Sequence, residues 1–214
     1  MLVNCELTFS EMAERILLLI PSIRDKKICN SQYCPRKETF AAFTVVLVGP
    51  SAFESSESLA MAVLPSGDDP TCDFPIPAEN AVPGGFYRFK PGLLRRRLCS
   101  GHVQTCRDLG EYLLFQIHVD GEVQISSFQN PNVSTSGYTQ TLDYFPQNFE
   151  VRGKKFLLRA VISYRPPGRG ELGHYTVYCF RSDQRWEEID DFKEKSVIVR
   201  GSRYVLSRAV LYTV

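Results

Sequence analysis

The segments GHYTVYCF, at residues 173–180, and WEEIDD, at residues 186–191, decide the fold of this chain. The first places His174 at the start of a run of β-branched and aromatic residues, which is typical of a strand. The polar residues 181–184 between the two segments predict a turn, so the second segment can return beside the first as a hairpin. That hairpin would bring Asp190 next to His174. A hydrolase can use such a pair as a base and the acid that orients the base.

Two apolar segments flank this hairpin, FLLRAVISY at residues 156–164 and YVLSRAVLY at residues 204–212. The order is a strand ending in Ala-Val, a short loop, Gly-His-Tyr, a strand, Trp, Asp-Asp and a last apolar strand. It resembles the histidine box and terminal strands of the ubiquitin-specific proteases, a family of cysteine deubiquitinases. Weaker matches to the family are YLLFQI at 112–117 and FPQNFEV at 145–151. The resemblance is specific over residues 140–214, looser over 107–139 and only positional before that.

The fold class expected on this basis is α+β. Runs of strands after a single helix favour an antiparallel sheet with one leading helix, and the resemblance implies the palm and fingers portion of a papain-like cysteine protease. Residues 1–214 are then a single partial domain. Within it, residues 26–110 are expected to be a fingers-type insertion and residues 111–214 a palm sheet that carries the histidine box.

The resemblance also implies roles for individual residues. His174 matches the catalytic histidine, Asp190 the acid that orients it and Asp191 a neighbouring support. Gly173, Tyr175 and Trp186 match positions expected to contact the substrate, which is ubiquitin or a ubiquitin-like protein. At Gly173 the missing Cβ would let the backbone of the ubiquitin tail approach closely.

The family's nucleophile lies in an amino-terminal box, roughly Gly-Leu-x-Asn-x-Gly-Asn-Thr-Cys-Tyr-x-Asn, and these 214 residues contain nothing like it. Cys5 precedes the first expected helix but lacks the Gly-Asn context. Cys179 shares a strand face with Tyr175 rather than with His174, which predicts a core thiol. We therefore expect a deubiquitinase-like chain that does not cleave isopeptide bonds alone, since loss of a nucleophile leaves little beyond binding.

Three origins for such a chain stay open, namely a fragment, an alternative product and a pseudoenzyme. Two other functions also stay open. One is a non-catalytic module that binds ubiquitin or a SUMO-like modifier, and the other is a scaffold without affinity for either. If the palm sheet normally packs against a nucleophile-bearing lobe, its apolar face requires a covering partner or makes the chain poorly soluble.

Seven cysteines raise the question of a metal site. Cys29 and Cys34 are separated by four residues, and Cys99 and Cys106 by six. Both spacings are wider than the Cys-x2-Cys turns of most four-cysteine zinc sites. A metal-free, degenerate finger is therefore preferred over a zinc site, with Cys72 and His102 as substitute ligands if zinc is bound.

Composition excludes several other classes of function. Hydrophobic residues make up 43% and charged residues 23% of the chain, and the net charge is +1. Nothing in this balance indicates a nucleic-acid or membrane partner. The apolar run at residues 16–20 is too short to span a bilayer. Without a signal-peptide pattern, free thiols predict a cytoplasmic or nuclear protein.

Local patterns predict the remaining elements. A capping box at Thr8–Glu11 starts a helix that Pro21 ends. Residues 49–110 read as an irregular insertion, and Asp120-Gly121 predicts a hairpin turn. Strands are expected at 39–48, 111–119, 121–128, 149–151, 156–164, 174–180, 185–189, 196–199 and 204–212.

Overall fold

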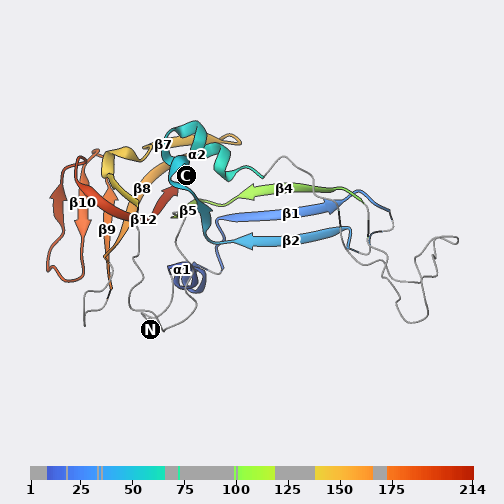
Figure 1. Cartoon of the computed structure of the whole chain (residues 1–214), viewed down its shortest axis with the longest axis horizontal. Helices are drawn as coiled ribbons and strands as arrows, with labels where there is room; N and C mark the ends of the chain where they lie inside the picture. The colour runs from blue at the N-terminus through green and yellow to red at the C-terminus, as the bar shows by residue number, and fades with distance from the viewer. Residues whose placement is uncertain are drawn as a thin grey trace. The chain divides into compact units, whose positions relative to one another are not determined.

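The computed structural model of the chain describes residues 9–17, 19–32, 34, 36–65, 72, 99, 101–118, 138–165 and 173–214 (Figure 1). They belong to two compact units. Unit 1 draws on residues 1–22, 43–64 and 109–214, and unit 2 on residues 23–42 and 65–108. The expected Asp120-Gly121 hairpin with strand 121–128, the Thr8 cap and Cys5 lie outside the described residues.

Unit 1 is built on a nine-stranded sheet with two α-helices and two 3-10 helices among its described residues. Its elements are α1 (Phe9–Leu17), β3 (Val46–Val48), η1 (Pro50–Phe53), α2 (Ser56–Val63), β5 (Tyr112–Ile117), β6 (Tyr138–Thr141), η3 (Leu142–Tyr144), β7 (Asn148–Val151), β8 (Lys154–Arg165), β9 (His174–Phe180), β10 (Trp186–Ile189), β11 (Val197–Val199) and β12 (Tyr204–Thr213).

The strand order in this sheet is β11-β10-β9-β8-β12-β5-β3, with β6 paired to β12 and β7 paired to β8. The pairs are antiparallel except for β3, which runs parallel to β5. The long strands β8 and β12 occupy the middle, where a strand is hydrogen-bonded on both sides. β10 and β9, which carry the expected site, therefore lie toward the β11 edge.

One face of the sheet packs against an aromatic core. Phe115 of β5 and Tyr212 of β12 are fully buried, with their ring centroids 5.8 Å apart. Phe53 of η1 covers this face and meets Phe115 edge-on at 6.0 Å. Aromatic pairs in this arrangement add to the stability gained from burial alone. Helix α2, which packs on η1 and β7, closes the layer with Leu59 and Val63.

Helix α1 covers part of the opposite face. Ala13 and Leu17 pack against Leu114 of β5 and Ala209 of β12. Ile16, by contrast, is 56% exposed although it belongs to the apolar periodicity that predicts the helix. The periodicity thus predicts the helix correctly, but only part of its apolar stripe is buried among the described residues.

Unit 2 contains a three-stranded sheet in the order β2-β1-β4, formed by β1 (Ile23–Cys29), β2 (Glu38–Phe43) and β4 (Val103–Leu109). Figure 1 shows β1 running opposite to both neighbours. Asp25 of β1 is buried and accepts two hydrogen bonds, each 2.7 Å, from the Arg107 guanidinium of β4. A bidentate contact of this kind compensates the burial of the carboxylate.

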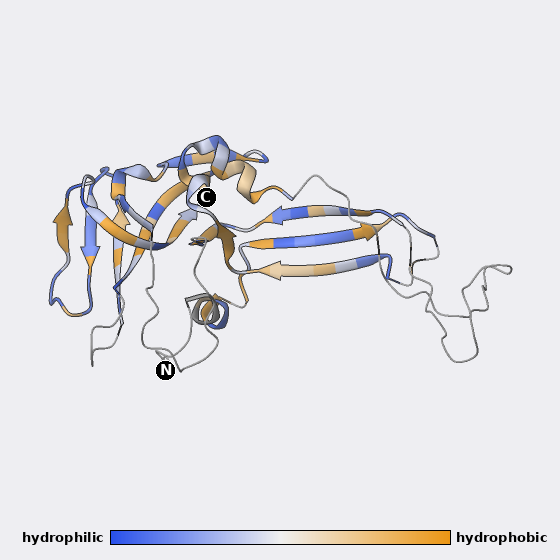
Figure 2. Ribbon diagram, viewed as in Figure 1, coloured by the Kyte–Doolittle hydropathy of each residue, from blue (hydrophilic) through white to orange (hydrophobic). Residues whose placement is uncertain are grey.

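The predicted α+β class is confirmed, and the sheet of unit 1 is antiparallel apart from the parallel β3–β5 pair, but the expectation of one helix was wrong. Ser56–Val63 forms α2, because Ser55 accepts a hydrogen bond from the Ser58 amide and so caps a helix within a stretch that reads as polar. Strand β1 was also missed. Its sequence IRDKKIC is mostly charged, and Figure 2 shows most of the strand as hydrophilic.

No described helix is both long and apolar enough to cross a membrane. One edge of the sheet of unit 1 is strand β11, which Figure 2 shows as apolar. Val197 and Ile198 of this edge strand are 46% and 57% exposed.

Candidate functional site

The β9–β10 hairpin brings the predicted residues together. Tyr178 pairs with Glu188, and Val177 pairs with Ile189. The turn between the strands is closed by a hydrogen bond from the Gln184 amide to the Arg181 carbonyl at 2.9 Å. Because strand side chains alternate between faces, this register places Asp190 on the same face as His174. The predicted hairpin is therefore present, with its turn at the predicted residues.

His174 and Asp190 form a direct contact at the end of the hairpin. His174 Nε2 lies 2.8 Å from Asp190 Oδ1, and the imidazole is 8% exposed. The same oxygen accepts a hydrogen bond from the Phe192 amide at 3.0 Å. Burial raises the pKa of Asp190, but the Phe192 amide, His174 and Lys193 outweigh burial, so the pKa lies below its ordinary value. Asp190 is thus an ionised carboxylate that can accept a hydrogen bond from Nε2–H of His174, and in that tautomer Nδ1 is the unprotonated nitrogen.

Asp191 lies on the other side of the ring. Its Oδ1 is 3.4 Å from His174 Nδ1, and its side chain is 79% exposed. This exposure means that Asp191 can move away from Nδ1 into water without leaving a buried charge behind. The structure therefore brings all three predicted polar residues together, with one tightly held acid and one loosely held acid.

Sequence reasoning missed Phe192 and Glu188. The Phe192 ring is stacked on His174, with centroids 4.0 Å apart and planes 12° apart. Glu188 is buried and binds Lys193 Nζ at 2.8 Å and Arg203 Nη1 at 2.7 Å. An aromatic residue directly after the Asp-Asp pair was the available signal for Phe192. Glu188 lies two residues after Trp186 and therefore shares its strand face, which was the available signal for its burial.

Gly173 is exposed, and the space that its side chain would occupy is filled by Tyr164. A Cβ at position 173 would collide with the Tyr164 hydroxyl, with Cζ at 2.6 Å. Tyr164 in turn packs on Tyr175, with ring centroids 4.6 Å apart, and Arg208 lies 5.8 Å from the Tyr164 centroid. Tyr175 is half-buried beside the site, and its pKa is raised by burial. The missing Cβ at position 173 thus accommodates a side chain of this same chain.

Trp186 occupies a different environment from the one expected of a substrate contact. It is 3% exposed, packs on Phe180 and donates a hydrogen bond from Nε1 to Asp143 at 3.1 Å. A ring buried this completely cannot touch a ligand at the surface. Trp186 is therefore a core residue that supports the strand leading to Asp190.

No cysteine in the described ranges hydrogen-bonds to His174. Cys179 faces the other side of β9, beside Ala160 and Glu187 in the ladder. Burial raises the pKa of its thiol, which makes it a poor nucleophile. The prediction that Cys179 is not a partner for His174 agrees with this placement.

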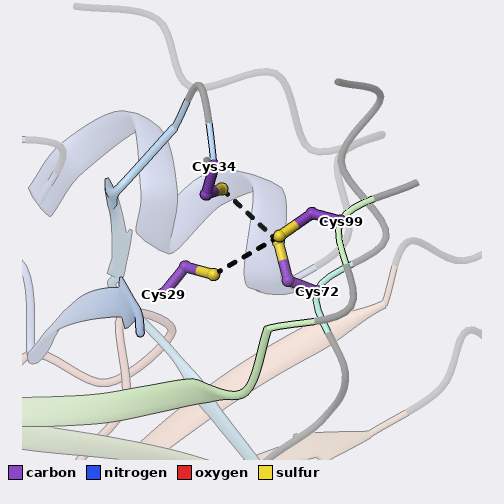
Figure 3. A group of neighbouring side chains, drawn as sticks. All are labelled: Cys29, Cys34, Cys72 and Cys99. Carbon is purple, nitrogen blue, oxygen red and sulfur yellow. Dashed lines mark hydrogen bonds between the residues drawn. The ribbon is translucent and has the colours of Figure 1, made fainter. Parts of the chain in front are cut away.

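Four cysteines, all of them in unit 2, have their side chains close together (Figure 3). Cys29, Cys34, Cys72 and Cys99 are buried, and their sulfur atoms all lie within 4.8 Å of one another. Sγ of Cys29 is 3.7 Å from Sγ of Cys99, and Sγ of Cys34 is 3.7 Å from Sγ of Cys72. In a tetrahedral site with Zn–S bonds of about 2.3 Å, neighbouring sulfurs lie about 3.8 Å apart. The donor set and its spacing therefore fit Zn²⁺.

The four thiols differ in how readily they ionise. Burial raises the pKa of Cys34 to about 12. At Cys99 burial is outweighed by hydrogen bonds from Gly101 and Ser31, which lower the pKa to about 7. Thiols this close cannot all ionise without a positive charge between them. Gly101 is required for close packing, because a Cβ there would lie 2.6 Å from Cys29 Sγ.

The ligand set predicted from spacing was wrong in one member. Cys106 is exposed on β4 and lines a pocket of about 450 Å³ together with Lys26 and Phe40. Its place is taken by Cys72, one of the two substitutes that the sequence suggested. His102, the other substitute, is exposed and does not join the cluster. Two turns with the Cys-x2-Cys spacing are unnecessary here because Cys72 and Cys99 come from two separate segments.

No family model matches the sequence. One curated protein is similar, the 120.7 kDa protein in the NOF-FB transposable element of Drosophila melanogaster. It is 30% identical over 95 residues, which are 44% of this chain and 9% of that protein. The chain thus spans less than a tenth of the relative that it matches.

Solved structures with a similar arrangement include a SAGA DUB module and a splicing factor. The Ubp8–Sgf11–Sgf73–Sus1 SAGA DUB module gives a TM-score of 0.43 at 12% identity, over 90% of this chain and 39% of the solved chain. The essential yeast splicing factor gives 0.42 at 12% identity, over 93% and 43%. The SAGA DUB module bound to monoubiquitin gives 0.42 at 11% identity, over 90% and 40%. In each case the chain spans less than half of the solved chain.

Proposed function

We propose that this chain is the histidine-bearing part of a deubiquitinase-like protein of the ubiquitin-specific protease type. The observation that carries the proposal is the 2.8 Å contact between His174 Nε2 and Asp190 Oδ1, made by the two strands of one hairpin. The sequence resemblance of residues 140–214 supports the family. A papain-like relationship is part of the same proposal.

The His174–Asp190 pair is oriented as the base and the orienting acid of a cysteine hydrolase need to be. Asp190 holds the proton on Nε2, so Nδ1 is free to take a proton from a thiol when Asp191 moves aside. The thiolate so formed would attack the carbonyl of an isopeptide bond, and the imidazolium would return the proton to the leaving amine. No described residue supplies that thiol. The chain by itself is therefore expected to bind a modifier without cleaving its bond.

Unit 2 is proposed to be the fingers-type insertion. It draws on residues 23–42 and 65–108, while residues 43–64, which lie inside the expected range 26–110, belong to unit 1. The four-thiol cluster supports a zinc-bound finger, since bound Zn²⁺ would hold segments that are far apart in sequence. Reduced thiols support the proposal of a cytoplasmic or nuclear location.

A second candidate function is non-catalytic recognition of ubiquitin or a SUMO-like modifier, or a scaffold role. The observation in its favour is that Tyr164 occupies the space beside Gly173. The proposed path of a modifier tail over Gly173 requires that space or a movement of Tyr164. A binding module has no need to align a tail with His174, so the obstruction would be tolerated.

The proposal also includes a partner lobe that covers part of the palm sheet. Ile16 is 56%, Leu19 89% and Ile20 58% exposed at the end of α1. Apolar side chains gathered in this way are typical of a surface that another protein element covers. Light scattering tests this idea, because a stable, monodisperse monomer over a wide concentration range would contradict it.

The decisive experiment treats the full chain with ubiquitin that bears a carboxyl-terminal electrophile and measures intact mass, alongside a titration with unmodified ubiquitin. The proposal expects reversible binding and no covalent adduct. An adduct that disappears in His174→Ala would mean that the chain carries its own nucleophile. Absence of binding to both ubiquitin and a SUMO-like modifier would refute the proposal and leave the scaffold. Cys106→Ser serves as a control for adventitious reaction of the exposed thiol.

A further inference from the structure

Phe192 occupies an unusual position for an exposed aromatic residue. Its side chain is 73% exposed, yet its ring lies flat on the imidazole of His174, with centroids 4.0 Å and planes 12° apart. Here the ring faces a titratable side chain that is 8% exposed.

The same residue also holds the acid. The Phe192 amide donates to Asp190 Oδ1 at 3.0 Å, which is the oxygen that His174 Nε2 approaches at 2.8 Å. Phe192 thus touches both members of the pair, the acid through its backbone and the base through its side chain. Removal of the ring leaves the backbone contact in place, so the two contributions can be separated by mutation.

The turn that carries Phe192 is fixed at both ends. The Lys193 amide donates to the Asp190 carbonyl at 2.9 Å, and Lys193 Nζ binds the buried Glu188 carboxylate at 2.8 Å. The ring of Phe192 therefore does not rely on burial for its position. It projects from a short closed turn, directly over the face of His174.

We propose that Phe192 is a positioning residue for the His174–Asp190 pair, which it serves by fixing the plane of the imidazole so that Nε2 faces Asp190 and Nδ1 faces the exposed Asp191. This inference rests on the proposed function, because a fixed tautomer matters to a base that must accept a proton on one particular nitrogen. Without the ring, the imidazole can rotate about its side-chain torsions, since the sp³–sp² torsion of histidine is broad. Water then also reaches the face that Phe192 covers.

Two measurements on the full chain test the proposal, and neither requires an activity assay. The first is the pair of imidazole nitrogen chemical shifts of His174, which report how much of the neutral ring carries its proton on Nε2. The second is the rate at which diethyl pyrocarbonate modifies His174, mapped by mass spectrometry. The chain has three histidines, and the exposed His102 and His118 are internal references for the reagent.

The wild-type chain should show mainly the Nε2–H form and slow modification of His174. Phe192→Ala should raise the modification rate about twofold to tenfold, the range that an aromatic pair contributes, and should reduce the share of the Nε2–H form. Phe192→Tyr, which keeps the ring, should restore both values. Ile198→Ala is the matched control, since Ile198 is an exposed apolar residue that follows Phe192 in the chain, on β11.

The proposal is overturned if folded Phe192→Ala keeps both wild-type values, or if Ile198→Ala changes them equally. Phe192→Leu guards against a folding defect, because it keeps apolar bulk without a ring. Wild-type behaviour of this variant would also overturn the role of the ring. Neither readout contains ubiquitin, so a failure of the wild-type chain to bind ubiquitin would refute the proposed function and leave the result on Phe192 standing.

Discussion

Glu188 and Asp190 share one ammonium group. Lys193 Nζ lies 2.8 Å from Oε1 of the buried Glu188 and 3.6 Å from Oδ2 of Asp190. Arg203 binds the other oxygen of Glu188 at 2.7 Å and lies over the Tyr178 ring at 5.5 Å. The acid that orients His174 is thus connected to the core of the sheet through one lysine and a buried glutamate.

Replacement of Glu188 by Ala should lower the free energy of unfolding by about 1.5–3 kcal/mol, the range of a hydrogen bond to a charged group. A larger loss is not expected, because Lys193 and Arg203 are both more than two-fifths exposed and can turn to water. Urea unfolding measures the change. Glu187→Gln is the control, since Glu187 has separate partners in Arg181 and Ser196. Equal effects of the two changes would contradict the special role of Glu188.

Gly173→Ala should destabilise the chain by about 1 kcal/mol, the low end of the cost of overpacking, because its Cβ would collide with the end of the half-buried Tyr164 side chain, which can shift. Removal of the phenol by Tyr164→Ala should relieve the collision. The double variant should therefore lose less unfolding free energy than the two single variants lose in sum. A double-mutant cycle by thermal unfolding measures this coupling. Additive effects would mean that Tyr164 is not the obstacle.

Purification without chelator should give about one zinc per chain, the stoichiometry of one four-cysteine site. Cys72→Ser should reduce the zinc content, since Cys72 belongs to the four-thiol cluster, and Cys106→Ser should not, since Cys106 is exposed outside it. Elemental analysis of both variants gives the comparison. Because thiolate ligands must lose their protons, zinc should also be released on acidification. Zinc-free wild-type protein, or equal loss in the two variants, would contradict the site.

The folded chain should lose the contribution of Asp190 in acid. Its pKa in the folded state lies below its ordinary value, whereas in the unfolded chain it should be about 3.9. The carboxylate therefore stabilises the fold above that pH, and this stabilisation disappears as the pH falls through the lower, folded value. Wild type should exceed Asp190→Asn in unfolding free energy near neutral pH, and the difference should shrink in acid. Urea unfolding across this pH range measures it, and a constant difference would be evidence against the ionised pair.

The sequence by itself determined the strands of the carboxyl-terminal half and the pairing of His174 with Asp190. β9, β10 and β12 follow from short-range alternation and turn residues, and each element lies within two residues of its expected bounds. A hairpin is a local structure, so a polar turn at 181–184 is sufficient to set which residues face each other. The face of Cys179 followed from the same alternation.

Only the tertiary structure decided the remaining parts of both sites. The charged sequence of β1 has no strand pattern of its own, and it pairs because β2 and β4 lie on either side of it. Cys72 joins the thiol cluster from a segment 38 residues away from Cys34, and the stacking of Phe192 on His174 depends on how a turn closes after the strand ends. The β1–β4 pairing and the thiol cluster join segments that are far apart in sequence, and the Phe192 contact depends on the closure of one turn. Side-chain periodicity carries no information about them, because they are fixed by packing and by the closure of turns in three dimensions.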